Sequence, residues 1–332
     1  MKINKSHKFL TEYSDFLTKK RVFDSITGQE ENITLPMMIP HWMKVSDKKS
    51  LLYSQDPYFR EGYNLFEYIL GSQLYDFCKH HTYILIRPDA IVSRKVNLII
   101  SELEKMNYKL VYGKILKIDR HMSRAVWFYH LNAAPTERFS IIDFFFERKE
   151  CLFVLLENIS SNNASSELSS KKGSVNINRR NNQDLRSRIS AKDNLLSFIH
   201  APDEICDMIR EIIIFFDAKV IKTILYHVHS MKPKNISQLT KSLYNKTKER
   251  DLNIEIIIQK LRDKIFSLPN HFIEKNLITE ELSKLSKKGY KPYKKFLSQL
   301  FQLPLDLDHW DKIILLSHFS QEDLQDIKYL DQ

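Results

Sequence analysis

The chain lacks several features that would place it in a specialised class of protein. It has three cysteines, Cys78, Cys151 and Cys206, which lie far apart and are odd in number. They indicate neither a disulfide framework nor a zinc site, and we expect them to be small buried apolar residues. No apolar run approaches the roughly 20 residues that a membrane-spanning helix needs. The first residues also lack the apolar stretch of a secretion signal, so we expect a cytoplasmic protein.

Positive charge is concentrated in the C-terminal part of the chain. The net charge is +10, and the segment from Lys222 to Lys295 holds 17 Lys and Arg against 7 Asp and Glu. A basic surface attracts polyanions, whether nucleotides, nucleic acid or an acidic partner. A solvated lysine-rich surface explains the same composition, so the charge alone does not choose between these readings.

The length and the residue pattern favour more than one packed unit. With 332 residues, 43% of them apolar, the chain is longer than a usual domain and has ample material for a core. We interpret residues 1–80 as an N-terminal extension that packs on the core, 81–220 as the core domain, and 221–332 as a basic, mainly helical C-terminal domain.

Apolar runs alternate with amphipathic helices in the core domain. The run from Thr82 to Arg87 stops at Pro88, which is typical of a buried strand. Further strands are predicted at 109–118, 151–157 and 195–200, and helices at 96–107, 120–146 and 202–216. The order of strand, helix, strand, helices and strand indicates an α+β fold.

Two other segments have distinctive compositions. Residues 159–183 are rich in Ser, Asn, Lys and Arg, so they bury too little apolar surface to offset their ordering entropy and are predicted to be a flexible insertion. Beyond Lys219, the sequence VIKTILYHV predicts a strand, on which His227 and His229 would share a face as an incomplete metal pair. Helices are predicted around 236–249, 253–266, 278–287 and 291–302.

The first two of those helices, with their lysines, form a candidate helical hairpin. A helix-turn-helix that binds nucleic acid is one interpretation. A plain packing unit is the alternative, because helical hairpins of that kind are far commoner.

Two motifs carry a resemblance to a known family. The first strand ends in Arg87-Pro88-Asp89-Ala90, and a later run reads Ser197-Phe198-Ile199-His200-Ala201-Pro202-Asp203. In order and separation they resemble the Lys-Pro-Asp-Gly turn and the Asn-x-x-His-Gly-Ser-Asp stretch of nucleoside diphosphate kinases, over residues 82 to 216. The resemblance implies a ferredoxin-like antiparallel sheet with helices, to which helical extensions are added.

The resemblance also implies roles for individual residues. His200 would carry a phosphoryl group, Glu211 would hydrogen-bond it, and Tyr129 would lie close to it. The nucleotide would be contacted by Arg87 and by Arg186, with Arg188 as a competitor because the spacing to the histidine differs by one residue. The nucleoside triphosphate would come with Mg²⁺, and the chain would form a homo-oligomer.

The chemistry of these residue types agrees with such a role. A neutral imidazole offers a nitrogen lone pair to a phosphorus atom, and a carboxylate on the other nitrogen fixes the tautomer. Arginines and a divalent cation neutralise the charge on the transferring phosphoryl oxygens. Each residue also has a structural interpretation, such as a pair between Arg87 and Asp89, a solvated acidic face for Glu211, and a core position for Tyr129.

The sequence also departs from the family pattern. Arginine replaces lysine at 87, and an arginine differs from a lysine in shape and reach. Ala90, Ser197 and Pro202 replace the glycine, asparagine and serine of the two motifs. The insertion has no clear equivalent of the family's further phosphate-binding arginine, although Lys172, Arg179 and Arg180 supply charge. We therefore expect a divergent phosphotransferase, with a non-catalytic nucleotide-sensing or nucleic-acid-associated module as the alternative.

Overall fold

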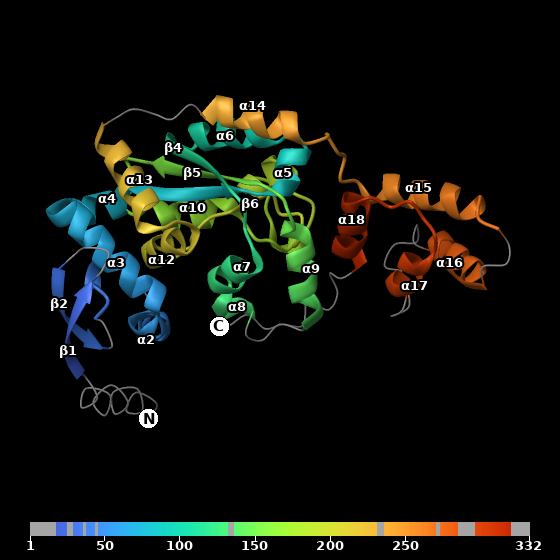
Figure 1. The fold of residues 1–332 in the computed structure, drawn as a ribbon. Helices are drawn as coiled ribbons and strands as arrows, with labels where there is room; N and C mark the ends of the chain where they lie inside the picture. Colours follow the sequence, from blue (N-terminus) through green and yellow to red (C-terminus); the bar gives the residue numbers. More distant parts are fainter. Residues whose placement is uncertain are drawn as a thin grey trace, which may run out of the picture.

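A four-stranded antiparallel sheet lies at the centre of the computed structural model (Figure 1). The structure describes residues 18–24, 29–35, 38–43, 46–131, 136–230, 236–269, 273–284 and 296–319. The sheet consists of β3 (His81–Ile86), β4 (Lys109–Leu116), β5 (Cys151–Glu157) and β6 (Ile199–His200), in the order β4-β5-β3-β6. This is the strand order of a ferredoxin-like fold, so the predicted α+β class is confirmed.

Helices cover both faces of the sheet, and this explains why β3 and β5 are almost continuously apolar. Every residue of β3 is buried, and in β5 only Glu157 is not. Figure 1 shows α6 and α14 on one side of the sheet and α10 and α12 on the other. A strand buried on both faces needs apolar side chains at every position instead of at alternate ones.

The helices of the core connect the strands in chain order. Their bounds are α5 (Pro88–Val92), α6 (Val96–Lys105), α7 (Arg120–Val126), α8 (Phe128–Leu131), α9 (Thr136–Phe146), α10 (Ala164–Lys172), the 3-10 helix η3 (Ile177–Arg179), α11 (Leu185–Arg188) and α12 (Ile205–Phe215). Proline at the first position of α5 stops β3, as the sequence predicted.

The segment predicted to be a flexible insertion is ordered in part, which corrects that interpretation. Asn163 caps α10 by accepting a hydrogen bond from the Ser166 amide, and Leu168 is fully buried. The Ser165 hydroxyl lies 3.0 Å from the Thr82 hydroxyl on β3. Small side chains allow this helix to approach the sheet closely, so a composition typical of a loop becomes a packed helix once a partner surface is present.

Two predicted strands also differ from the structure. The run from Leu195 forms a strand only at Ile199–His200, because the preceding residues are held in turns around Asp193. The run beyond Lys219 is the helix α13 (Ala218–Ser230), whose apolar stripe packs on α3 and β4. The strand face that would have aligned His227 and His229 therefore does not exist.

The N-terminal extension is attached mainly through one long helix. It comprises β1 (Thr18–Asp24), β2 (Gln29–Leu35), η1 (His41–Met43), α2 (Asp47–Gln55), α3 (Pro57–Leu70), η2 (Gly71–Gln73) and α4 (Leu74–His80). Helix α3 packs closely along α12. A Cβ atom at Gly62 would lie 2.7 Å from Ile213 and 2.8 Å from Ile209, so this contact requires glycine.

The C-terminal part is helical in the described residues. After α13 come α14 (Ile236–Lys246), α15 (Ile254–Phe266), α16 (Ile273–Lys284), α17 (Phe296–Gln302) and α18 (His309–Phe319). Helix α14 lies against β4, whereas α18 packs on α9. Across the described ranges, none of the helices combines the length and apolarity needed to cross a bilayer.

Candidate functional site

His200 and Glu211 form a pair in the middle of the core domain. His200 ends β6, and Glu211 lies on α12, which packs beneath the sheet. The Nε2 atom of His200 lies 2.9 Å from Oε2 of Glu211. The histidine side chain is 17% exposed and the glutamate side chain 8%, so the carboxylate is buried while the imidazole reaches the surface. Within the described part of the chain, Nδ1 of His200 has no hydrogen-bond partner.

A second group holds the Glu211 carboxylate. The Tyr83 hydroxyl on β3 donates a hydrogen bond to the same oxygen, Oε2. Burial alone would raise the pKa of Glu211, but His200 and the hydrogen bond from Tyr83 outweigh it and lower the pKa. Glu211 is therefore held as a carboxylate, the form that can orient an imidazole.

Aromatic rings surround the histidine on two sides. The Trp127 ring, directly after α7, lies edge-on at 5.5 Å from the His200 ring, and the Tyr83 ring lies 6.3 Å away. These rings exclude water from two sides of the imidazole and restrict its rotation. The ring is thereby presented in one orientation.

The backbone before His200 is strained. Phe198 has a φ angle of 67°, which is unfavourable for a bulky side chain. Its amide donates to the Asp89 carboxylate at 2.9 Å, and its carbonyl accepts from the Arg87 amide at 2.9 Å. Strain of this kind costs about 1–3 kcal/mol and persists only where the surroundings over-determine it. The Pro88-Asp89 turn thus fixes the position from which His200 projects.

Arg87 lies across the same region but is turned inward. One guanidinium nitrogen donates to the Ser197 hydroxyl at 2.7 Å, and another donates to the Leu195 carbonyl at 2.7 Å. The guanidinium also stacks over the Phe145 ring, 4.6 Å from its centre. In the described structure Arg87 braces the turn that leads to His200.

Arg186 makes a similar set of contacts from α11. It donates to the Gly173 carbonyl and, at 3.0 Å, to the Ile199 carbonyl next to His200. Burial lowers its pKa to about 9, and the neighbouring charges of Arg180 and Arg87 act in the same direction. A buried guanidinium that lies near other positive charges is stabilised when an anion binds beside it.

Lys172 and Arg180 add positive charge on the same side. The Lys172 ammonium on α10 lies 2.7 Å from the Ala201 carbonyl and 2.6 Å from the Asp203 carboxylate. Arg180 donates to three main-chain carbonyls, those of Ser174, Val175 and Ala191. Lys172 therefore holds the backbone next to His200, whereas Arg180 holds the loops around Ser174 and Ala191.

The core domain matches one protein family. The model of the nucleoside diphosphate kinase family matches residues 80–221. Residues 80–221 form a nucleoside diphosphate kinase-like domain. No match was found among curated proteins.

Solved nucleoside diphosphate kinases are similar to this domain at low identity. The apo enzyme of Encephalitozoon cuniculi is 21% identical with a TM-score of 0.36, covering 41% of this chain and 87% of that one. The Aquifex aeolicus enzyme is 17% identical with a TM-score of 0.36, covering 42% of this chain and 95% of that one. The assignment of a nucleoside diphosphate kinase-like domain rests on the strand order and on the match to the family model, and not on the TM-scores.

Two of the residues predicted for this site lie elsewhere in the domain. Arg188 pairs with Glu102 on α6 at 2.8 Å, so Arg186 and not Arg188 lies beside β6. The Tyr129 hydroxyl donates to Asp56 at 2.9 Å, and its ring stacks on Tyr53 of the N-terminal extension. The chain turns between α7 and α8, and this places Trp127 against His200 and directs Tyr129 to the extension, which corrects its expected position.

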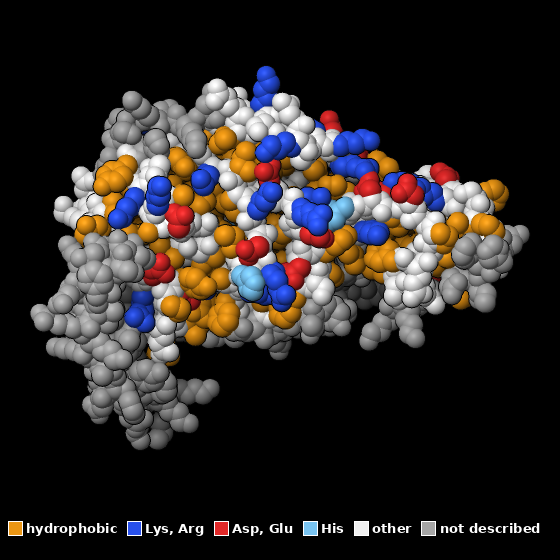
Figure 2. Space-filling view, viewed as in Figure 1, with side chains coloured by type: hydrophobic (Ala, Val, Ile, Leu, Met, Phe, Trp, Pro, Cys, Tyr) orange, Lys and Arg blue, Asp and Glu red, His pale blue; other side chains and the backbone are white. Residues whose placement is uncertain are grey.

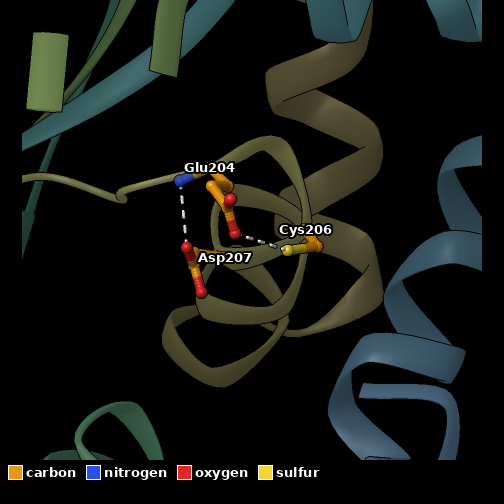
Figure 3. Close-up of side chains that lie close together, drawn as sticks. All are labelled: Glu204, Cys206 and Asp207. Atoms are coloured by element: carbon orange, nitrogen blue, oxygen red, sulfur yellow. Dashed lines mark hydrogen bonds between the residues drawn. The ribbon is translucent and has the colours of Figure 1, made fainter. Parts of the chain in front are cut away.

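Three possible metal ligands meet at the start of α12 (Figure 3). Ligand atoms of Glu204, Cys206 and Asp207 lie within 4.8 Å of one another. The Lys49 ammonium from α2 lies 2.6 Å from carboxylate oxygens of both Glu204 and Asp207. Burial also raises the pKa of the Cys206 thiol, which disfavours the thiolate that a metal needs. The cluster is neutralised by a lysine and offers no vacant cation site.

The structure brings the predicted residues His200, Glu211, Arg87 and Arg186 close together, and it adds two neighbours that sequence reasoning overlooked. Tyr83 and Trp127 both contact the imidazole, and each lies in an apolar or aromatic run where it looks like ordinary core. No local sequence signal distinguishes them, because the contact of Tyr83 with His200 depends on the pairing of β3 with β6, and that of Trp127 depends on the turn between α7 and α8.

Proposed function

We propose that the nucleoside diphosphate kinase-like domain transfers a phosphoryl group from a nucleoside triphosphate through a phosphohistidine at His200. The observation that carries the proposal is the pair between Nε2 of His200 and Glu211, which leaves Nδ1 as the nucleophile. The Nδ1 lone pair forms a bond to the γ-phosphorus while the bond from phosphorus to the bridging oxygen breaks. The nucleoside diphosphate leaves with that electron pair.

Glu211 stabilises the product of this step. The proton on Nε2 stays between the imidazole and the carboxylate, so the positive charge that develops on the ring faces a buried negative one. In the second half of the cycle an acceptor oxygen attacks the phosphohistidine, and the nitrogen recovers its lone pair. His200 and Glu211 are the proposed catalytic pair.

The positive charge around β6 supports a polyphosphate substrate. Arg87, Arg186 and Lys172 all donate to backbone or side-chain oxygens between Leu195 and Asp203. A bound phosphate would compete with those oxygens for the same donors. Among the described residues, the buried Nε atoms of both arginines have no hydrogen-bond partner, although Nε of Arg87 lies 3.8 Å from the Asp89 carboxylate. Mg²⁺ would arrive with the triphosphate as part of the substrate and be held chiefly by phosphates and water.

Labelling of the protein tests the proposal. Incubation with γ-labelled ATP or GTP and Mg²⁺ is expected to give an acid-labile label in the full chain and in His41→Ala, which replaces an exposed histidine of the extension. The label should be absent from His200→Ala. The proposal is wrong if the full chain takes no label, or if His200→Ala takes as much label as the full chain.

A second candidate is a module that binds nucleotide without turnover. It is favoured by the hydrogen bonds of Arg87 and Arg186 to protein oxygens, since these donors hold the fold instead of standing open for a transition state. Calorimetry with ATP and GTP distinguishes the two. If ATP or GTP binds with micromolar affinity and the protein takes no label, the chain is a nucleotide-binding module and not a phosphotransferase.

The surface charge gives less support to a nucleic-acid partner. On the face shown in Figure 2, Lys and Arg side chains are interspersed with acidic and apolar ones and do not form one continuous stripe. A nucleic-acid partner requires binding that weakens steeply with salt. The same calorimetry at two salt concentrations, with single-stranded DNA and RNA, measures that dependence.

A further inference from the structure

Tyr83 carries a polar group in a strand that is buried along its whole length. All six residues of β3 are buried, and Tyr83 is fully buried. Its ring lies 5.0 Å from the Phe153 ring and 5.7 Å from the Phe215 ring. A phenylalanine would make the same packing contacts, so the hydroxyl needs a separate explanation. A buried hydroxyl is costly unless it has a hydrogen-bond partner.

The partner of that hydroxyl is the carboxylate oxygen that holds the histidine. Tyr83 donates to Oε2 of Glu211, and the same oxygen lies 2.9 Å from Nε2 of His200. The three groups come from β3, α12 and β6 and form one chain of hydrogen bonds. Pro202 stands where the family motif has a serine, so a side-chain hydroxyl that could lie close to the histidine is absent from the motif itself.

We propose that Tyr83 is a positioning residue, whose hydroxyl fixes the Glu211 carboxylate and moderates its pull on the proton at Nε2 of His200. The inference deepens the proposed function and rests on it for its catalytic meaning. An oxygen that accepts two hydrogen bonds shares its charge between both donors. The imidazole is therefore held in place by a carboxylate oxygen whose charge is shared with a second donor.

Other charges around Glu211 keep the carboxylate ionised when the hydroxyl is removed. Arg210, on the same helix, and His200 both lower the pKa of Glu211. Asp207, one turn earlier on α12, repels Glu211, but it is paired with Lys49 and accepts a hydrogen bond from Tyr53. Tyr83→Phe should therefore strengthen the bond between Glu211 and the imidazolium.

The direct test is the titration of His200 in histidine-labelled protein, followed by NMR. In Tyr83→Phe the titration midpoint of His200 should move up by at most about 1–2 pH units, which is the full effect of losing one hydrogen bond to a charged group. The matched control is Tyr108→Phe, which removes another buried hydroxyl, one that donates to the Ala164 carbonyl at 2.9 Å. That control should leave the His200 midpoint unchanged.

The acid side of the labelling profile gives a second readout. The pH at which the labelling rate is half its maximum should rise in Tyr83→Phe by the same amount as the titration midpoint. If neither chain takes label but the midpoint still moves, the proposed function fails and the hydrogen-bond chain stands. A midpoint that is the same in wild type, Tyr83→Phe and Tyr108→Phe overturns the inference.

A measurement on the unaltered protein applies if Tyr83→Phe does not fold. A buried phenol that donates to a carboxylate gives a slowly exchanging hydroxyl proton, which proton NMR can assign through its proximity to the Tyr83 ring. Its signal should be present in wild type and displaced in Glu211→Gln. Absence of that proton from the wild-type spectrum contradicts the inference.

Discussion

The two sides of His200 use charge in different ways. On the α12 side, Glu211 reaches the imidazole directly and is itself held by Tyr83. On the opposite side, most hydrogen bonds of the cations go to main-chain carbonyls, as for Lys172, Arg180 and Arg186. The first side contains a candidate catalytic pair, whereas the cations of the second side hold the loops. Residue type alone therefore does not say whether a charge serves a substrate or the fold.

Both flanking regions reinforce this difference. Two ion pairs join the N-terminal extension to α12: Asp56 pairs with Arg210, and Lys49 pairs with Asp207. The C-terminal helix α18 reaches the loop side, where the Ser317 hydroxyl donates to Asp193. Asp193 also accepts the amides of Leu195 and Leu196, in the turn that precedes β6. Each flank supports a different half of the candidate site.

The largest expected effect is on stability and comes from breaking the ion pair between Asp56 and Arg210 on α12. Asp56→Asn removes the paired carboxylate of Arg210, which is 2% exposed, and should lower the free energy of unfolding by about 3–5 kcal/mol. Denaturant unfolding measures this change. The control is Asp143→Asn, whose pair with Arg124 is partly exposed and should contribute at most about 1 kcal/mol. Equal losses in both variants would show that α12 is not held in this way.

Glu211→Gln tests the direct contact with His200. The labelling rate should fall by about 10²-fold, because a neutral amide lacks the negative charge that stabilises the imidazolium. The matched control is Glu102→Gln, which alters a buried acid paired with Arg188 away from β6. A labelling rate in Glu211→Gln within twofold of wild type would remove Glu211 from the proposed mechanism.

The same carboxylate should contribute to stability in acid. The pKa of Glu211 is lowered in the folded chain, so its contribution is fully present above the unfolded pKa, about 4.3, and is lost as pH falls through the folded pKa. Below about pH 4.3 wild type should lose stability faster than Glu211→Gln, by at most about 1.4 kcal/mol per pH unit. Urea unfolding at several acidic pH values measures both slopes. Parallel slopes would contradict the assignment.

The smallest effect is expected on the loop side. Partial loss of solvation would raise the pKa of Asp203, but the Lys172 ammonium and the Ser169 hydroxyl outweigh it and hold that pKa well below its usual range. The Asp203 side chain is 57% exposed, so Lys172→Gln should change the free energy of unfolding by less than about 1 kcal/mol. Labelling should slow only a few-fold. A loss as large as that of Glu211→Gln would mean that Lys172 contacts the substrate directly.

The sequence predicted the fold better than it predicted the site. Apolar runs at β3, β4 and β5 were found because strands buried on both faces have few alternatives. Helix α10 was missed because its small polar residues become helical only against the sheet. Trp127 and Tyr129 differ by two positions, and only the turn between α7 and α8 decides which of them faces His200.

The pairing of His200 with Glu211 was predicted from the sequence through the family resemblance, because a motif and a fixed separation on a strand and the next helix are local properties. The α+β class and the basic C-terminal segment were also predicted from the sequence. Tertiary structure alone decided what each charge does. The arginines turned inward because main-chain carbonyls lay within reach, and Tyr83 met Glu211 because β3 pairs with β6 above α12. The hydrogen bond from Tyr83 to Glu211 spans 128 positions, and a contact over such a separation leaves no pattern along the chain.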